Sequence, residues 1–268
     1  MPKKERSKTL KTLSTINIFI ICLTLSACAS KSDIATPASN TGKQSFEMRD
    51  KSGLFRLVRE FGPVANSKKV LAVKQVVQDS SGVIFERSIV MGRIGSLKGK
   101  VNVLRPEKSE YTVWFDGKEY TNRIEINTKL KAMVVNLKSP EPEWNGEKTF
   151  TFPPGTGAYC YFSQILECAQ VMNFMPKAIA AGGGAMNLHV VWEGYPYFQQ
   201  QYVGIPDELF TQATFSYDGE NHKGLRRFSL SISNSNQIIF YHVHKDNSLA
   251  AIFWPAQGLS IGSTGSDE

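Results

Sequence analysis

Apolar residues recur at every second position along most of this chain, which is the spacing of β-strands that bury one face. Turn residues separate these runs. Asp116-Gly117 is one such turn, and its residues suit the positive φ angles of a two-residue hairpin. We expect strands near residues 70–77, 83–90, 101–104, 111–115, 119–126, 130–137, 147–152, 188–192, 195–203, 211–217, 225–233, 237–244 and 249–254. The pattern predicts a mainly β protein built from hairpins.

Two segments depart from this period of two. Residues 46–61 carry apolar side chains that fit a short amphipathic helix ended by Gly62-Pro63. Residues 163–174 give the strongest helical pattern, with Ser163 as a candidate N-cap. The apolar stripe of this central helix is Ile165, Leu166, Ala169 and Met172.

Strands and helices do not alternate regularly, so a parallel sheet is not expected. We predict a single β-rich domain at residues 46–259, formed by a curved antiparallel sheet or half-open β-barrel with one or two helices. The central helix would cover the concave side of the sheet. Residues 260–268 are expected to form a flexible tail.

The first 27 residues have the layout of a secretory signal, with a basic start, an apolar run and a small-residue exit. The apolar run is about 13 residues long, and a helix needs about 20 to span a bilayer. The signal ends at Leu25-Ser26-Ala27-Cys28, which resembles the lipobox of bacterial lipoproteins. An ordinary signal followed by a chance cysteine is the alternative.

The resemblance implies cleavage before Cys28 and lipidation of its thiol, with frequent acylation of the new amino terminus. Two or more acyl chains anchor a protein stably to a membrane. Ala29 stands where an Asp would retain a Gram-negative lipoprotein in the inner membrane, which implies the outer membrane. Residues 28–45 then form a lipidated, disordered tether, because they are polar and rich in Ser, Thr, Asn and Pro.

Removal of the signal changes the charge of the chain. The signal holds five of the 31 Lys and Arg residues and one of the 24 Asp and Glu residues, so the net charge falls from +7 to +3. No dense basic stripe remains in the mature sequence. Nucleic acid is therefore not an expected partner.

Signal cleavage removes Cys22 and lipidation occupies Cys28, which leaves Cys160 and Cys168 as a pair in an exported protein. We predict a disulfide between them, with two buried thiols as the alternative. Residues eight apart in one helix lie about 12 Å apart, whereas a disulfide needs Cα atoms within about 7 Å. If the bond forms, Cys160 must lie outside the helix.

The densest aromatic stretch supplies candidate ligand-binding residues, namely Trp192, Tyr195, Tyr197, Phe198 and Tyr202. If Tyr195–Tyr202 is one strand, Tyr195 and Tyr197 share one face, while Phe198 and Tyr202 share the other. Plain core packing is the alternative role.

His242 and His244 would share a face of a strand and are candidate metal ligands, but the sequence nominates no third ligand. Gly258–Gly262 matches a G-x-S-x-G nucleophile motif, but no His follows it, so we do not predict a catalytic serine. We predict no cofactor and assign no catalytic residue.

The order of elements resembles that of half-barrel carriers of the lipoprotein-localisation type, at the level of architecture alone. We expect an outer-membrane-anchored periplasmic lipoprotein that acts as a non-enzymatic binding module for an apolar ligand or an envelope protein. One alternative is a cell-envelope hydrolase with an unrecognised site. The other is a purely structural role in envelope assembly.

Overall fold

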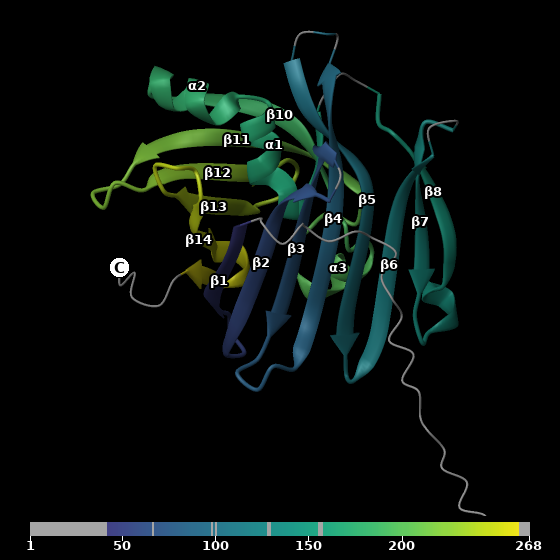
Figure 1. The fold of residues 1–268 in the computed structure, drawn as a ribbon. Helices are drawn as coiled ribbons and strands as arrows, with labels where there is room; N and C mark the ends of the chain where they lie inside the picture. The colour runs from purple at the N-terminus through teal and green to yellow at the C-terminus, as the bar shows by residue number, and fades with distance from the viewer. Residues whose placement is uncertain are drawn as a thin grey trace, which may run out of the picture. The chain divides into compact units, whose positions relative to one another are not determined.

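The computed structural model describes residues 42–65, 67–97, 99, 101–127, 130–154 and 158–262 (Figure 1). The strands are β1 (Gly42–Arg49), β2 (Leu54–Val64), β3 (Ser67–Gln78), β4 (Ile84–Leu97), β5 (Val101–Phe115), β6 (Lys118–Asn127), β7 (Ala132–Lys138), β8 (Gly146–Thr151), β9 (Ala158–Tyr161), β10 (Gly184–Val191), β11 (Phe210–Glu220), β12 (Arg226–Ile232), β13 (Ile238–Val243), β14 (Leu249–Trp254) and β15 (Leu259–Gly262). The helices are α1 (Ile165–Val171), α2 (Phe174–Ala181) and α3 (Tyr197–Gln201), with 3-10 turns η1 (Pro142–Trp144), η2 (Phe162–Gln164) and η3 (Pro255–Gln257).

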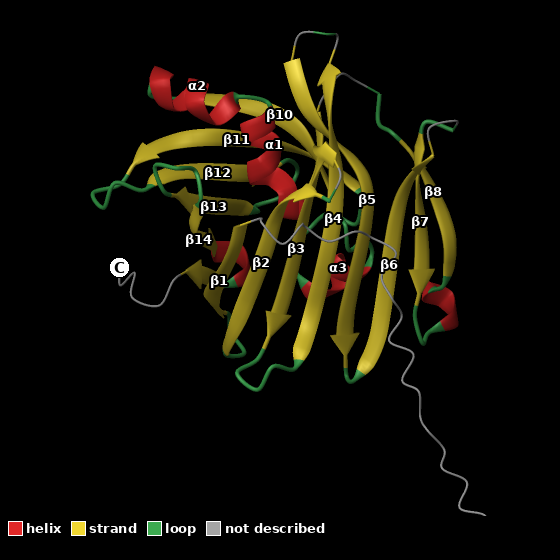
Figure 2. Ribbon diagram, viewed as in Figure 1, coloured by secondary structure: helices red, strands yellow, loops and turns green. Residues whose placement is uncertain are grey.

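These strands form one mainly antiparallel sheet that curves around the helices (Figure 2). Its order is β8-β7-β6-β5-β4-β3-β2-β1-β15-β14-β13-β12-β11-β10-β9. The N-terminal half, β1 to β8, and the C-terminal half, β9 to β15, meet where β1 pairs with β15. The predicted fold class, a mainly β protein with a curved, barrel-like sheet and a covering helix, is confirmed.

The hairpin pattern of the sequence is largely confirmed in the N-terminal half. The turn at Asp116-Gly117 has φ angles of 49° and 74°, as a type I′ turn requires. The runs expected separately at 101–104 and 111–115 belong to the single strand β5.

The helix expected at residues 46–61 is wrong, because β1 and β2 occupy this segment. Phe46 and Met48 alternate inward on β1, and Leu57 and Arg59 do so on β2. The spacing of the apolar residues in this segment fits both a helix and a strand. Strands form here because β1 pairs with β15 and β2 pairs with β3.

Both expected boundaries of the domain also shift. β1 begins at Gly42, within the segment expected to be a tether, and β15 extends to Gly262, within the expected tail. The remaining parts of the signal, tether and tail lie outside the described residues. Among the described residues, the buried apolar core runs from Phe46 to Ile261.

The chain crosses the concave side of the sheet between β9 and β10, which form the parallel pair of the sheet. The expected helix at 163–174 is instead η2 and α1, followed by a left-handed residue, Asn173, with φ of 56°. Pro176 lies in the first turn of α2, where a missing N–H costs no hydrogen bond. Proline is therefore compatible with the start of α2.

The free edge of the C-terminal half curls back, so that β9 and α1 contact β5. This closes much of the concave space and buries large side chains from both halves, among them Tyr111, Tyr161, Trp192 and Trp254. None of the helices in the described part of the chain is long and apolar enough to cross a membrane.

Candidate functional site

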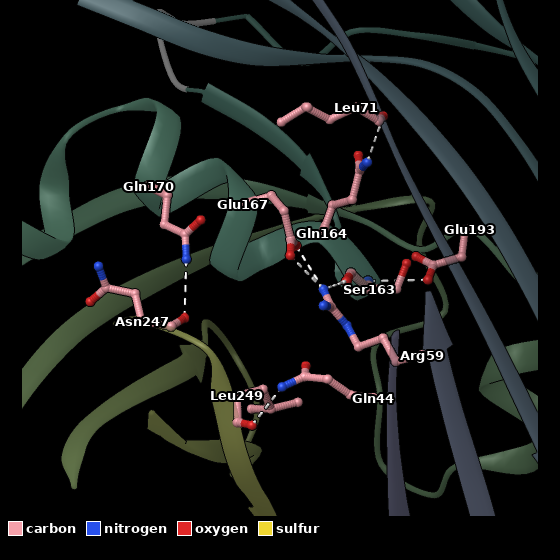
Figure 3. Close-up of polar contacts among 10 residues, drawn as sticks. All are labelled: Gln44, Arg59, Leu71, Ser163, Gln164, Glu167, Gln170, Glu193, Asn247 and Leu249. Carbon is pink, nitrogen blue, oxygen red and sulfur yellow. Dashed lines mark hydrogen bonds and ion pairs between the residues drawn. The ribbon is translucent and has the colours of Figure 1, made fainter. Parts of the chain in front are cut away.

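Four charged side chains lie buried beneath η2 and α1, at the centre of the curved sheet. They are Arg59 on β2, Glu86 on β4, Glu167 on α1 and Glu193 just after β10, and we call them the interior network. Figure 3 shows how Arg59, Glu167 and Glu193 converge on the helical segment. Buried charges are stable only when paired or hydrogen-bonded, so each partner matters.

Arg59 joins α1 to the N-terminal half of the sheet. Its Nη2 atom lies 2.7 and 2.8 Å from the two carboxylate oxygens of Glu167 and donates to the carbonyl oxygen of Ser163 at 3.3 Å (Figure 3). The side chains of Arg59 and Glu167 are only 4% and 10% exposed, so water screens the pair poorly. The guanidinium also stacks over Phe61, 4.9 Å from the ring centroid.

Glu193, which follows β10 in the C-terminal half, binds the backbone at the start of the helical segment formed by η2 and α1. Its carboxylate accepts hydrogen bonds from the backbone N–H groups of Phe162 at 3.0 Å and Ser163 at 3.1 Å. The hydroxyl of Ser88 lies 3.4 Å away. Burial raises the pKa of Glu193, because desolvation outweighs the hydrogen bonds that favour the charged form.

Glu86 is another carboxyl group of the network with a raised pKa. It accepts hydrogen bonds from Tyr202 Oη and Gln201 Nε2, each at 3.0 Å, and Tyr111 Oη donates to Gln201 Oε1 at 2.9 Å. Burial raises the pKa of Glu86 to about 7, and the nearby Glu193 adds to the shift. Glu86 therefore changes charge near neutral pH.

Two glutamine side chains also connect the helical segment of η2 and α1 to the rest of the body. Gln164 Nε2 donates to the carbonyl oxygen of Leu71 on β3 at 3.0 Å, and Gln170 Nε2 donates to that of Asn247 at 3.2 Å (Figure 3). A Cβ atom on Gly92 would lie 2.7 Å from Leu104 Cγ and 3.0 Å from Gln164 Oε1. Glycine at this position therefore makes room for Gln164 against the sheet.

A cavity of about 70 Å³ lies among these residues. Arg59, Glu86, Ser163 and Glu193 supply its polar wall, and the apolar wall includes Leu57, Ile165, Leu166, Phe198, Tyr202 and Trp254. Pockets for drug-sized ligands measure about 300–1,000 Å³. A cavity of this size has room for a few water molecules or a very small ligand. Since Ile165 and Leu166 form one wall, the volume depends on where α1 lies.

The predicted aromatic residues are only partly at this site. Phe198 and Tyr202 line the cavity. Trp192 and Tyr197 are buried outside it, with Trp192 Nε1 donating to Thr211 Oγ1 at 2.9 Å, and Tyr195 packs on Phe150. The strand expected at 195–203 is wrong, because a cis Tyr195-Pro196 bond precedes helix α3, so the predicted sharing of faces does not apply.

The structure joins Cys160 and Cys168 in a disulfide, with their Cα atoms 6.2 Å apart. Cys160 lies on β9 and Cys168 on α1, so the bond links the helix to the edge of the C-terminal half. This meets the geometric condition that Cys160 lie outside the helix. Cys28 lies outside the described residues.

The two candidate metal ligands do not form a cluster. His242 is half-buried on β13, and His244 is exposed on the turn that follows. Burial lowers the pKa of His242, and the charge of Arg227 lowers it further. Among the residues that the structure describes, no group of three or more His, Cys, Asp or Glu side chains could hold a metal ion.

Sequence reasoning missed the interior network. A usable signal existed, because Arg59 and Glu86 stand at inward positions of alternating segments, where apolar residues are expected. Arg59 was hidden by the helix prediction for residues 46–61. Glu167 lies beside the apolar stripe of the central helix, and only the curvature of the sheet brings it to Arg59.

No protein-family model matches this chain, and no curated protein matches it either. Among solved structures, it is similar to a β-barrel-like protein from Brucella abortus with a domain of unknown function, DUF1849. That likeness has a TM-score of 0.44 at 9% identity and covers 85% of this chain and 95% of the other. Similarity at this level supports no inference about activity.

Proposed function

We propose that this protein is an outer-membrane lipoprotein of the periplasm and a non-enzymatic binding module, which takes an apolar ligand bearing a polar group into the cavity beneath α1. The observation that carries the proposal is the mixed wall of this cavity. Most of its lining is apolar, and a few buried polar groups converge on one side. Such a combination is typical of ligand sites, where the polar groups fix orientation.

The size of the cavity adds a condition. At about 70 Å³ it is too small for a long acyl chain, so a larger ligand requires α1 to move outward. The sheet itself need not change, because Ile165 and Leu166 contribute one wall from the helix. Binding and displacement of α1 are therefore coupled, and the ligand must offset the loss of the Arg59–Glu167 contact.

The anchor rests on the lipobox-like residues that end at Cys28. Expression of the full chain with radiolabelled palmitate tests it. We expect label in the wild type and in Cys22→Ser, whose altered cysteine precedes the cleavage site, and none in Cys28→Ser. Label that persists in Cys28→Ser would refute the anchor.

Native mass spectrometry of the mature protein, purified from its host, tests the ligand. We expect a bound small molecule that is absent from Leu166→Trp, which fills the cavity. The matched control is Ile179→Trp on α2, because Ile179 does not line the cavity and should leave the ligand in place. Wild-type protein without any bound species would count against the proposal.

A carboxylate-dependent hydrolase is the second candidate. The observation in its favour is that Glu86 and Glu193 both line the cavity and both have raised pKa values. Screening wild type, Glu86→Gln and Glu193→Gln against glycan and peptide substrates tests it. Turnover that disappears in either variant would favour the enzyme over the binding module.

A further inference from the structure

The hairpin turns of the N-terminal half fall at two opposite ends, because antiparallel strands reverse direction at every turn. One end holds the turns after β2, β4 and β6, and the other holds the turns after β1, β3, β5 and β7. In Figure 1 the β3–β4 and β5–β6 connections lie at the bottom.

Charge divides sharply between these ends. The described residues at and beside the turns after β2 and β6, 65, 67–69 and 130–131, include Lys68, Lys69 and Lys131 and no acidic residue, and we call this the lysine end. Segments 50–53, 79–83, 116–118 and 138–145, at or beside the acidic end, contain five acidic residues and three lysines.

The described lysines at this end are available to a partner. Lys68, Lys69 and Lys131 are exposed and make no ion pair among the described residues. Acidic side chains on the adjoining strands already have basic partners. Glu60 pairs with Lys43 and Lys74, Glu107 with Arg93, and Glu125 with Lys108. The positive charge of the lysine end is therefore not compensated by its surroundings.

The start of β1 also lies at this end, since Gly42 pairs with Phe61 near the end of β2. The chain that leads back to Cys28 thus joins the body on the side of the lysines. We propose that the lysine end binds the anionic headgroups of the membrane that carries the lipid anchor, and so orients the body with its acidic end outward. This inference rests on the anchor in the proposed function.

The two ends differ in charge but not in the exposure of their apolar side chains, so charge determines which end would face the membrane. Leu130 is 60% exposed at the lysine end, but Leu54 and Val83 are 47% and 55% exposed at the acidic end. An anionic surface would repel the five acidic residues there. Each lysine close to such a surface strengthens binding roughly fivefold, so a cluster acts strongly even when single contacts are weak.

Vesicle sedimentation of the chain from Ala29 to Glu268 tests the proposal. This chain contains every buried apolar residue of the described structure but not Cys28, so its binding is independent of lipidation. We expect binding to phosphatidylcholine vesicles containing phosphatidylglycerol, none to pure phosphatidylcholine, and loss of binding at high salt. The triple variant Lys68→Gln, Lys69→Gln, Lys131→Gln should bind roughly a hundredfold more weakly.

The matched control neutralises three lysines at or beside the acidic end, Lys51→Gln, Lys118→Gln and Lys138→Gln, and should bind as the wild type does. Equal weakening of both variants would overturn the proposal, because net charge alone would then explain binding. So would binding to soluble heparin without binding to the anionic vesicles. Either failure leaves the palmitate result for Cys28 intact and so separates this inference from the anchor itself.

Discussion

The two main helices of the crossover, α1 and α2, are held in very different ways. Five consecutive residues of α1, Ile165 to Ala169, are buried, and the helix is tied to the sheet by an ion pair, a disulfide and the Gln170 amide. Only Met175 and Ala178 are buried on α2. Among the described residues, no side-chain hydrogen bond or ion pair joins α2 to the sheet.

This difference indicates which helix controls the cavity. α1 forms part of its wall and carries the polar contacts, whereas α2 packs on β10 and β11 away from it. Movement of α2 alone would leave the cavity closed. Opening requires the buried contacts of α1 to break, so their strength sets the resistance to opening.

The largest effect is expected from the buried pair. Arg59→Met leaves Glu167 buried without its partner, and unfolding in urea should show a loss of about 3–5 kcal/mol. Arg59→Met combined with Glu167→Met should recover most of that loss, because no unpaired charge remains. The exposed Arg93–Glu107 pair is the control, and Arg93→Met should cost less than about 1 kcal/mol. Equal losses for both single variants would contradict a special role for α1.

The second effect is a pH dependence that comes from Glu86. Its pKa in the folded protein is raised to about 7, so the folded state holds a proton that the unfolded state releases near pH 4.5. The contribution of Glu86 to the free energy of unfolding should therefore be fully present below pH 4.5. It should fall by on the order of 3 kcal/mol as the pH rises to about 7.

Glu86→Gln should remove most of this slope, and urea unfolding between pH 4.5 and 7.5 measures it. Glu193 also has a raised pKa and should leave a slope of the same sign. Parallel pH profiles for wild type and Glu86→Gln would show that Glu86 does not carry the dependence.

The third effect concerns the disulfide. Replacement of both Cys160 and Cys168 by Ser opens a loop with a sequence separation of 8, which should cost about 2–3 kcal/mol. Hydrogen exchange should show the added opening in α1, with little change in α2. If the exchange rate of the variant, relative to the wild type, increased more in α2 than in α1, the disulfide would stabilise α2 rather than α1, and this prediction would be wrong.

The smallest effect is expected on α2. Ile179→Ala truncates a partly buried side chain and should destabilise by about 1 kcal/mol, whereas Leu166→Ala on α1 should cost about 2–5 kcal/mol. Thermal unfolding of the two variants compares them directly. A larger cost at Ile179 than at Leu166 would reverse the proposed order of the helices.

Local patterns predicted local structure well. The Asp116-Gly117 hairpin and most strands follow from alternation and turn residues alone. The cysteine pair followed from counting the cysteines that remain after the predicted signal and lipidation site. At residues 46–61 the apolar spacing suited two periods, and a distant partner, β15, helped to settle the outcome.

The interior network depends on long-range geometry. Arg59 and Glu167 are 108 positions apart, and Glu86 and Tyr202 are 116 apart, so no local pattern links them. Tyr195–Tyr202 was misassigned because aromatic residues favour strands, whereas the turn at Pro196 starts a helix. Sequence therefore identified two lining residues, Phe198 and Tyr202, but not the charges beside them.

The most direct test of the account is fluorescence titration of N-phenyl-1-naphthylamine, an apolar probe, into the chain from Ala29 to Glu268. We predict saturable binding of one probe per wild-type molecule, abolished in Leu166→Trp and retained in Ile179→Trp. The variant with both Cys160→Ser and Cys168→Ser, in which α1 opens more readily, should bind more tightly than the wild type. Identical isotherms for all four proteins would contradict a binding site beneath α1.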